Sequence, residues 1–159
     1  MHENSPLPPI IQQDEKLVRL VFSPFHLNKA KTRLTPNAFR PPPGRGEVSV
    51  IRLNFTDANF CRQAGKKIEA DDKVKGGFKV FEGFGVVLFL EVLEAQAAVK
   101  ASPLPDNPFH ADLYFGFVLQ KGEPLPAELN EKMKRLSEVA RFYPDPQKEA
   151  LDWKGQELI

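Results

Sequence analysis

Residues 47 to 55, EVSVIRLNF, carry the clearest strand signal in the chain. Val48 and Val50 share one parity, and the apolar residues from Ile51 onward share the other. Successive side chains of a β-strand point to opposite faces of a sheet, so a change of parity has two explanations. The segment therefore predicts a strand that either contains a bulge or is buried on both faces.

Further apolar segments flank this strand, and clusters of proline separate them. Because proline has no backbone donor and ends regular elements, the 15 prolines divide the chain into units. Strands are also predicted over residues 16–22, 78–90 and 112–119. Thr56 or Asp57 can cap a helix that carries Phe60, Ala64 and Ile68 on one face. Strands and helices interleave irregularly, which predicts an α+β fold with a small, mostly antiparallel sheet and two to three helices.

The C-terminal part contains the strongest helix signal. Residues 124–144, PLPAELNEKMKRLSEVARFYP, place Pro126 near the first turn and Pro144 just past the end. Apolar residues recur along one face at Leu129, Met133, Leu136, Ala140 and Tyr143. We therefore expect a long C-terminal amphipathic helix. Another helix is expected where a strand-like run turns helical near Glu91 and keeps an apolar face through Val99.

Length and composition indicate one domain. The chain has 159 residues, of which 42% are hydrophobic, which suits a single core and is too little for two full domains. Residues 1–14 are rich in Pro, Gln and Asn and are expected to form a flexible leader outside the core. Residues 15–146 are expected to form the domain, and residues 147–159 a tail that lies on the surface or packs back loosely.

Several features bear on location and cofactors. The single cysteine, Cys61, cannot form an internal disulfide, and the start MHENSPLPP lacks the basic and apolar regions of a secretory signal. The longest apolar run, at residues 85–90, is far shorter than the roughly 20 residues that span a bilayer. We expect a soluble cytoplasmic protein with no membrane partner. The phosphate-loop, dinucleotide, HExxH and GxSxG motifs are absent from the sequence, so no cofactor is expected.

The charged side chains are unevenly distributed, although 22 basic and 21 acidic residues nearly cancel. From Lys16 to Gly46 there are seven cationic side chains and no carboxylate. Such a segment can contact nucleic-acid phosphates or an acidic protein surface. The alternative is a solvated loop whose charges are neutralised by the acidic 69–72 turn or by Glu47. A protein is the expected partner, with RNA or DNA as the alternative, and the candidate binding residues are Lys29, Lys31, Arg33, Arg40, Arg45 and Arg52.

Two Pro-Phe-His sequences contain the candidate catalytic residues, His26 and His110. If their imidazoles converge on one phosphate, they could act as general base and general acid, with Asp112 or Arg52 orienting the substrate. His26, His110 and Asp112 could instead ligate zinc, but Cys61 has no close partner and no metal is predicted. The structural alternative is that Ser-Pro and Asn-Pro start turns, the two phenylalanines pack inward and the imidazoles bind backbone groups. In a strand, His110 and Asp112 would share one face.

The two histidine segments resemble the motifs of the 2H phosphoesterases, two-lobed enzymes with two separated His-apolar-Thr/Ser-apolar motifs. The corresponding residues here are His26-Leu27-Asn28-Lys29 and His110-Ala111-Asp112-Leu113. Asn28 and Asp112 stand where that family has phosphate-binding hydroxyls, and Lys29 replaces an apolar strand residue. The resemblance implies a metal-independent hydrolase or phosphodiesterase that uses His26 and His110 as acid and base.

A second resemblance involves AFRPPPGRGEVSVIR, residues 38–52, and SPLPDNPFHADLYFG, residues 102–116. These segments are similar to motifs of short uncharacterised bacterial proteins, some of them encoded near defence or mobile-element genes. The resemblance implies a shared frame or surface that contains Phe39, Ser49, Arg52, Asn107, His110 and Asp112. Together with the basic segment, it favours an accessory or interaction subunit of a bacterial defence-related or regulatory assembly. The hydrolase is the alternative.

Overall fold

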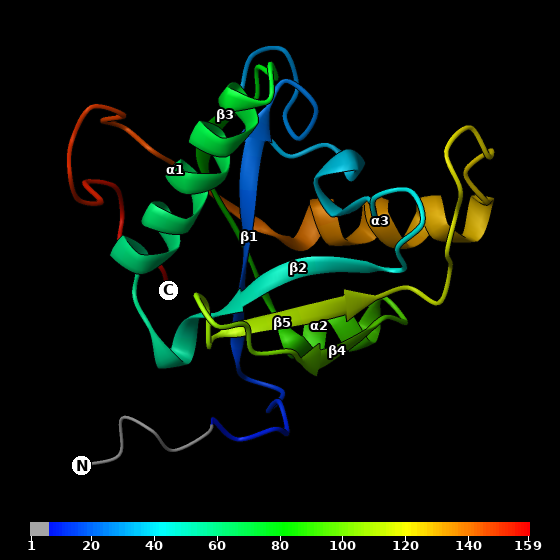
Figure 1. Ribbon diagram of the computed structural model, residues 1–159. Coiled ribbons are helices and arrows are strands. Elements are labelled where there is room, and N and C mark those ends of the chain that lie inside the picture. Colours follow the sequence, from blue (N-terminus) through cyan, green and yellow to red (C-terminus); the bar gives the residue numbers. More distant parts are fainter. Residues whose placement is uncertain (1–6) are drawn as a thin grey trace.

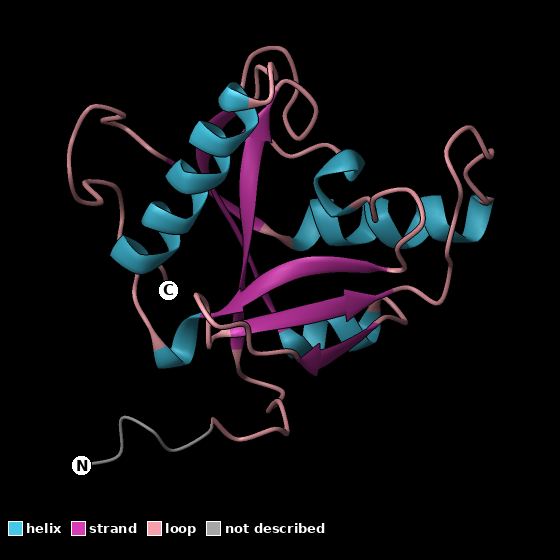
Figure 2. Ribbon diagram, viewed as in Figure 1, coloured by secondary structure: helices cyan, strands magenta, loops and turns pink. Residues whose placement is uncertain are grey.

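The computed structural model of the protein describes residues 7–159, and over this range six antiparallel strands form one sheet with helices on both faces (Figures 1 and 2). The strand order is β4-β5-β2-β1-β3-β6. The strands are β1 (Lys16–Ser23), β2 (Glu47–Arg52), β3 (Val80–Leu88), β4 (Ala98–Ala101), β5 (His110–Tyr114) and β6 (Arg141–Pro144). The helices are α1 (Ala58–Val74), α2 (Phe89–Glu94) and α3 (Ala127–Val139), with short 3-10 helices η1 (Pro36–Phe39) and η2 (Leu53–Phe55). The predicted single α+β domain is confirmed.

β2 contributes buried apolar residues to both faces of the sheet, although Ser49 is exposed, and this explains the change of parity in its sequence. Val48 and Val50 belong to the core that α2 and α3 cover, whereas Ile51 belongs to the core beneath α1. β2 pairs with β5 from Glu47 to Ile51 without a register shift, so the strand contains no bulge. Of the two explanations for the sequence pattern, burial on both faces is correct.

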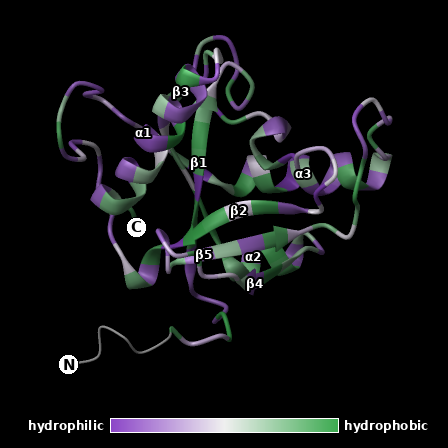
Figure 3. Cartoon of the chain, viewed as in Figure 1, coloured by the Kyte–Doolittle hydropathy of each residue, from purple (hydrophilic) through white to green (hydrophobic). Residues whose placement is uncertain are grey.

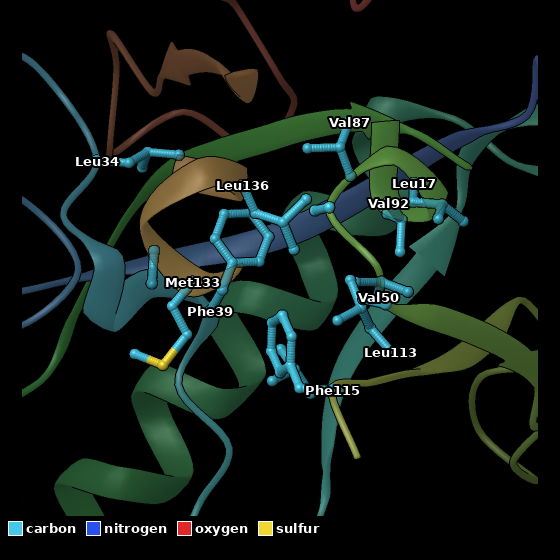
Figure 4. Close-up of a cluster of buried hydrophobic side chains, with 14 of the residues drawn as sticks. Leu17, Leu34, Phe39, Val50, Val87, Val92, Leu113, Phe115, Met133 and Leu136 are labelled. Atoms are coloured by element: carbon cyan, nitrogen blue, oxygen red, sulfur yellow. The ribbon is translucent and has the colours of Figure 1, made fainter. Parts of the chain in front are cut away.

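The larger core lies between the sheet and the layer formed by α2, α3 and η1. Leu129, Met133 and Leu136 are the apolar residues that α3 buries in it. Figure 4 shows how residues of this core from the sheet, the helices and the connecting segments meet in one cluster. Hydrophobic residues also colour much of β1 and β2 in Figure 3, as expected for strands in the middle of a sheet with two covered faces.

The smaller core lies between the sheet and α1. Asp57 caps this helix, because its side chain accepts the Phe60 amide hydrogen bond at 2.9 Å. Gly65 then allows α1 to approach β3 closely, since a Cβ atom at this position would lie 2.5 Å from Cε1 of Phe81. The glycine that weakens the helix by sequence criteria therefore permits its packing on the sheet.

β1 and β2 separate soon after they begin to pair. They are paired only at Leu17↔Arg52 and Val18↔Ile51, and Figure 1 shows the two strands diverging. Arg19 is the next residue of β1. Its Nε donates a hydrogen bond to the Ala38 carbonyl oxygen at 2.6 Å, and its Nη1 donates to the Ser49 carbonyl oxygen at 3.1 Å. The guanidinium thus satisfies a β2 carbonyl group that β1 does not reach.

The N-terminal residues that the structure describes are attached to the sheet. Ile11 is 7% exposed and belongs to the larger core. The Leu90 amide donates to the Gln13 carbonyl oxygen at 3.0 Å. The expectation that residues 1–14 lie outside the core is therefore wrong for Ile11, because the first turn of α2 has free amides to which this segment binds. Residues 1–6 lie outside the described part of the chain.

The residues after Pro146 pack more closely than expected for a loose tail. Trp153 lies against Phe84 with ring centroids 4.6 Å apart. Arg62 of α1, which is 3% exposed, donates to the Asp145 carboxylate at 2.9 Å. It also donates to the carbonyl oxygens of Gln147, Lys148 and Leu151. A buried guanidinium is stable only when its donors are satisfied, so these bonds hold the C-terminal segment on α1.

Two predicted helices end earlier than their apolar periods suggest. α3 ends at Val139, and Tyr143, which was expected on its face, lies in β6 and is 6% exposed. α2 ends at Glu94, and β4 replaces the helix that was expected to continue through Val99. β6 pairs with β3, which is distant in sequence, and β4 pairs with β5 across the 102–109 loop. A local helical period encodes neither pairing. Among the described residues, no helix combines the length and apolar character needed to cross a membrane.

Candidate active site

A pocket of about 400 Å³ lies between α1 and the middle strands of the sheet. β1, β2 and the start of β5 contribute to its lining, together with α1 and the loop that precedes β5. Its apolar lining includes Leu20, Phe22, Ile51, Phe60 and Leu104. Its polar lining includes Arg19, Ser49, Lys67, Asp71, Asn107 and His110. An apolar wall with a few convergent polar groups is typical of a small-molecule site.

The loop between β4 and β5 holds His110 in place. The Ser102 amide donates to the His110 carbonyl oxygen at 3.0 Å, and Nδ1 of His110 lies 2.9 Å from the Ser102 carbonyl oxygen. Phe109 packs edge-on against Phe60 of α1 with ring centroids 5.0 Å apart. The prediction that this Asn-Pro turn enters a strand, with Phe109 packed inward and the imidazole bound to a backbone group, is confirmed. The strand begins at His110, two residues before the predicted start.

Ser49 and His110 form a hydrogen-bonded pair in the pocket. Oγ of Ser49 lies 3.0 Å from Nε2 of His110. A carbonyl oxygen can only accept a hydrogen bond, so the contact with Ser102 assigns the proton of the neutral imidazole to Nδ1. Nε2 is then an acceptor, and the Ser49 hydroxyl donates to it. A serine hydroxyl that donates to an oriented imidazole is the arrangement of an activated nucleophile and its general base.

Asp112 lies beside this pair on the same face of β5, as predicted for His110 and Asp112. Its Oδ1 atom is 3.9 Å from Nε2 of His110. Over residues 7–159, Oδ1 of Asp112 is the buried side-chain polar atom that has no hydrogen-bond partner. A buried acceptor without a donor is unfavourable, and a proton arriving on Nε2 would provide a donor nearby.

Arg19 supplies positive charge next to Ser49. Its Nη1 donates to the backbone carbonyl of Ser49, and its side chain lines the same pocket. Burial lowers the pKa of Arg19 to about 10, which leaves the guanidinium charged at neutral pH. Lys67 also lines the pocket, but its Nζ is 2.9 Å from Asp71. Arg19 is therefore the cation best placed to meet negative charge that develops at Ser49.

No family model, curated protein or solved structure matches this chain. The candidate site therefore rests on its own geometry.

The apolar stripe of α1 lines the pocket, although two of its residues, Phe60 and Ala64, also pack against the smaller core. Phe60, Ala64 and Ile68 all face the pocket, and Ile68 is 41% exposed. Cys61 and Gly65, one position further along the chain, make the buried contact with the sheet. The fourfold spacing thus predicted the helix correctly, and the structure shows that its apolar face lines the pocket.

His26 does not line the pocket that contains His110. It lies in the turn after β1, where its Nδ1 accepts the Phe22 amide hydrogen bond at 3.1 Å. Burial, followed by the positive charges of Arg19 and Lys79, lowers the pKa of His26 to about 3. His26 is therefore neutral at physiological pH and cannot act there as a general acid. Phe25, which precedes His26 in the chain, is 64% exposed, so the prediction that it packs inward is wrong.

Arg52, predicted to bind a partner, is buried. It is 1% exposed, and its Nε and Nη2 donate to the two carboxylate oxygens of Glu15 at 2.6 and 3.2 Å. Its Nη1 donates to the Pro8 carbonyl oxygen at 2.7 Å. The assignment of Arg52 to partner binding or substrate orientation is corrected accordingly, because every one of these donors is used inside the protein.

The other predicted basic residues divide into two groups. Arg45 and Lys31 form ion pairs with Glu47 and Glu82 at 3.1 and 3.0 Å. Lys29, Arg33 and Arg40 are exposed and form no ion pair among the described residues. The basic segment thus contains both cations that are paired within the protein and cations that are not.

Cys61 and the possible metal ligands contribute no site of their own. Burial, followed by the charge of Asp57, raises the pKa of the Cys61 thiol to about 12, which keeps it protonated and unreactive. Within residues 7–159, no group of three His, Cys, Asp or Glu side chains is arranged to hold a metal ion.

Sequence reasoning assigned no role in catalysis to Ser49 or Arg19. Ser49 occurs in one of the resembling segments, but nothing in its neighbourhood indicates a contact with His110. That contact arises because Ser49 pairs with Asp112, and the next position on the same face pairs Ile51 with His110. Arg19 is the single charge inside the apolar run LVRLVF, a signal that could have indicated a functional or structural role.

Proposed function

We propose that the protein is a serine-dependent hydrolase of small phosphoesters, in which Ser49 is the nucleophile and His110 the general base. The observation that carries this proposal is the hydrogen-bonded series Ser49 Oγ, His110 Nε2, His110 Nδ1 and Ser102 carbonyl oxygen, at 3.0 and 2.9 Å. The backbone carbonyl performs the orienting task that a carboxylate performs in many catalytic triads, since it holds the imidazole in the tautomer that accepts a proton at Nε2.

The reaction would proceed in two steps, transfer of the phosphoryl group to Ser49 and hydrolysis of the resulting ester. Oγ of Ser49 attacks phosphorus while its proton moves to Nε2 of His110, and the ester bond to the leaving alcohol breaks as that proton is returned to the leaving oxygen. This step produces a phosphoserine ester at Ser49. Water then gives a proton to Nε2 and attacks phosphorus, and Oγ leaves with a proton from His110. The protonated imidazole of each step would be stabilised by Oδ1 of Asp112, 3.9 Å away.

One charged group of the pocket, the Arg19 guanidinium, favours a phosphoester over a neutral ester. The guanidinium of Arg19 matches phosphate oxygens well, lines the pocket and donates to the backbone carbonyl of Ser49. Asp71 and Asp106 also line the pocket, and Asp71 is paired with Lys67. The apolar residues on α1 and β1 can accommodate an aromatic or aliphatic alcohol within about 400 Å³.

Turnover of bis(p-nitrophenyl) phosphate, compared with p-nitrophenyl butyrate, tests the proposal. We expect phosphodiester cleavage by the wild type and a loss of kcat of about a thousandfold in Ser49→Ala and in His110→Gln, because both act in the same step. Ser137→Ala is the matched control, since this serine bonds the Lys134 carbonyl on α3, away from the pocket. A fluorophosphonate probe should form an adduct at Ser49. A folded wild type that neither cleaves these esters nor forms the adduct would exclude the proposal.

His26 separates this mechanism from a two-histidine phosphodiesterase. Since His26 does not line the pocket, His26→Asn should retain kcat within about twofold. A loss in this variant as large as that in His110→Gln would support the two-histidine mechanism instead. A role as an accessory subunit in a larger bacterial assembly stays a prediction, and affinity purification with mass spectrometry tests it.

A further inference from the structure

Two phenylalanine side chains are exposed next to each other at one end of the molecule. Phe25 is 64% exposed in the loop after β1, and Phe78 is 72% exposed in the turn between α1 and β3. Their ring centroids are 6.4 Å apart with an interplanar angle of 50°. Figure 1 shows the two segments together at the top of the view, beyond the end of β1. Exposed aromatic rings that gather on one surface indicate a contact with another molecule.

The same two segments concentrate positive charge. We call residues 24–35 and 73–79 the cationic tip. It contains no carboxylate, and its six cationic side chains are Lys29, Lys31, Arg33, Lys73, Lys75 and Lys79. This concentration contrasts with a net charge of +1 for the whole chain. The tip therefore complements an anionic partner.

Neighbouring carboxylates neutralise little of this charge. Lys31 pairs with Glu82 at 3.0 Å, and the other five cations form no ion pair among the described residues. Asp71 is engaged by Lys67 at 2.9 Å, and the Asp72 carboxylate accepts the Lys79 amide hydrogen bond at 3.1 Å. Asp71 is thus neutralised by Lys67, whereas Asp72 keeps its charge, and the six cations of the tip outnumber it.

We propose that the cationic tip binds single-stranded nucleic acid, with bases stacked on Phe25 and Phe78 and phosphates near the lysines. Unpaired bases expose the π faces that stack on aromatic side chains, whereas the bases of a duplex are already stacked on each other. Lysine side chains meet backbone phosphates without regard to sequence. The proposal uses neither Ser49 nor His110, so it stands apart from the proposed hydrolase.

Val74 provides an internal control. It is 88% exposed within the tip, but it has no aromatic face. Stacking on bases therefore predicts that Val74→Ser leaves binding unchanged. If the tip instead inserted into an anionic bilayer, Val74→Ser would weaken binding, because bilayer insertion depends on apolar area of any kind.

Fluorescence anisotropy with labelled single strands of about 15 nucleotides measures the interaction, using Ser49→Ala throughout to prevent turnover. Phe25→Ala combined with Phe78→Ala should weaken binding about tenfold or more, while Val74→Ser matches the parent protein. Lys73→Gln combined with Lys75→Gln should lower the salt dependence of binding. Circular dichroism should show that all variants are folded. Unchanged affinity in the phenylalanine variant, equal affinity for a duplex, or binding only to phosphatidylglycerol vesicles would overturn the proposal.

Discussion

Arg52→Leu should strongly destabilise the protein without removing any surface charge. The side chains of Arg52 and Glu15 are 2% and 4% exposed, and two hydrogen bonds at 2.6 and 3.2 Å join them. The leucine variant would leave the Glu15 carboxylate buried without its cation and the Pro8 carbonyl oxygen without its donor at 2.7 Å. Breaking a buried pair from one side costs about 3–5 kcal/mol, and we expect a loss of this size in the free energy of unfolding.

Urea denaturation of a matched pair of variants measures this effect. Arg45 also pairs with a glutamate, Glu47, at 3.1 Å, but its side chain is 59% exposed. Since exposed ion pairs contribute about 0–1 kcal/mol, Arg45→Leu should change stability by less than ~1 kcal/mol.

A double variant identifies the origin of the loss. Arg52→Leu combined with Glu15→Leu removes both buried charges, so it should recover most of the stability lost in Arg52→Leu. If Arg52→Leu lost no more than Arg45→Leu, or if the double variant were less stable than the single one, the reasoning about the buried pair would be refuted.

Three further predictions follow from packing and burial. Because the pKa of His26 is lowered to about 3, the unfolded chain takes up a proton below about pH 6.5 that the folded protein does not. Stability should therefore fall by about 2 kcal/mol between pH 6.5 and 4.5, and His26→Asn should flatten this dependence in urea titrations. Gly65→Ala should gain about 1 kcal/mol of helix propensity but lose more through overlap with Phe81, for a net loss of about 1–2 kcal/mol in the free energy of unfolding. Phe81→Leu should partly relieve this loss, and a stabilised Gly65→Ala variant would contradict the packing argument. Cys61 should react with a thiol reagent only after denaturation, and rapid labelling of the native protein would show that the thiol is accessible.

Several parts of the fold were predictable from local sequence. The parity of EVSVIRLNF indicated either a bulge or two covered faces, of which the second is correct, and Thr56 or Asp57 indicated the start of α1, which Asp57 caps. Proline and asparagine before His110 indicated the turn that leads into β5. Each of these features depends on side-chain period, capping or turn chemistry, and all three are encoded within a few neighbouring residues.

Other parts depended on contacts that local patterns do not encode. Tyr143 fitted the apolar period of α3, but its pairing with Phe84 of β3 places it in β6. The sequence gives no signal that distinguishes Arg52 from the exposed arginines Arg33, Arg40 and Arg45. Only the position of Glu15 beside Arg52 makes one of them a buried structural residue.

The sequence by itself determined the α+β class, the central strand with its change of parity, the capped helix α1 and the turn that presents His110. Only the tertiary structure decided that His110 meets Ser49 and not His26, and that Arg19 lies in the split between β1 and β2. The physical reason is register: period and turn chemistry are local, whereas the pairing of Ser49 with Asp112 joins residues far apart in the chain and is selected by the packing of the whole sheet.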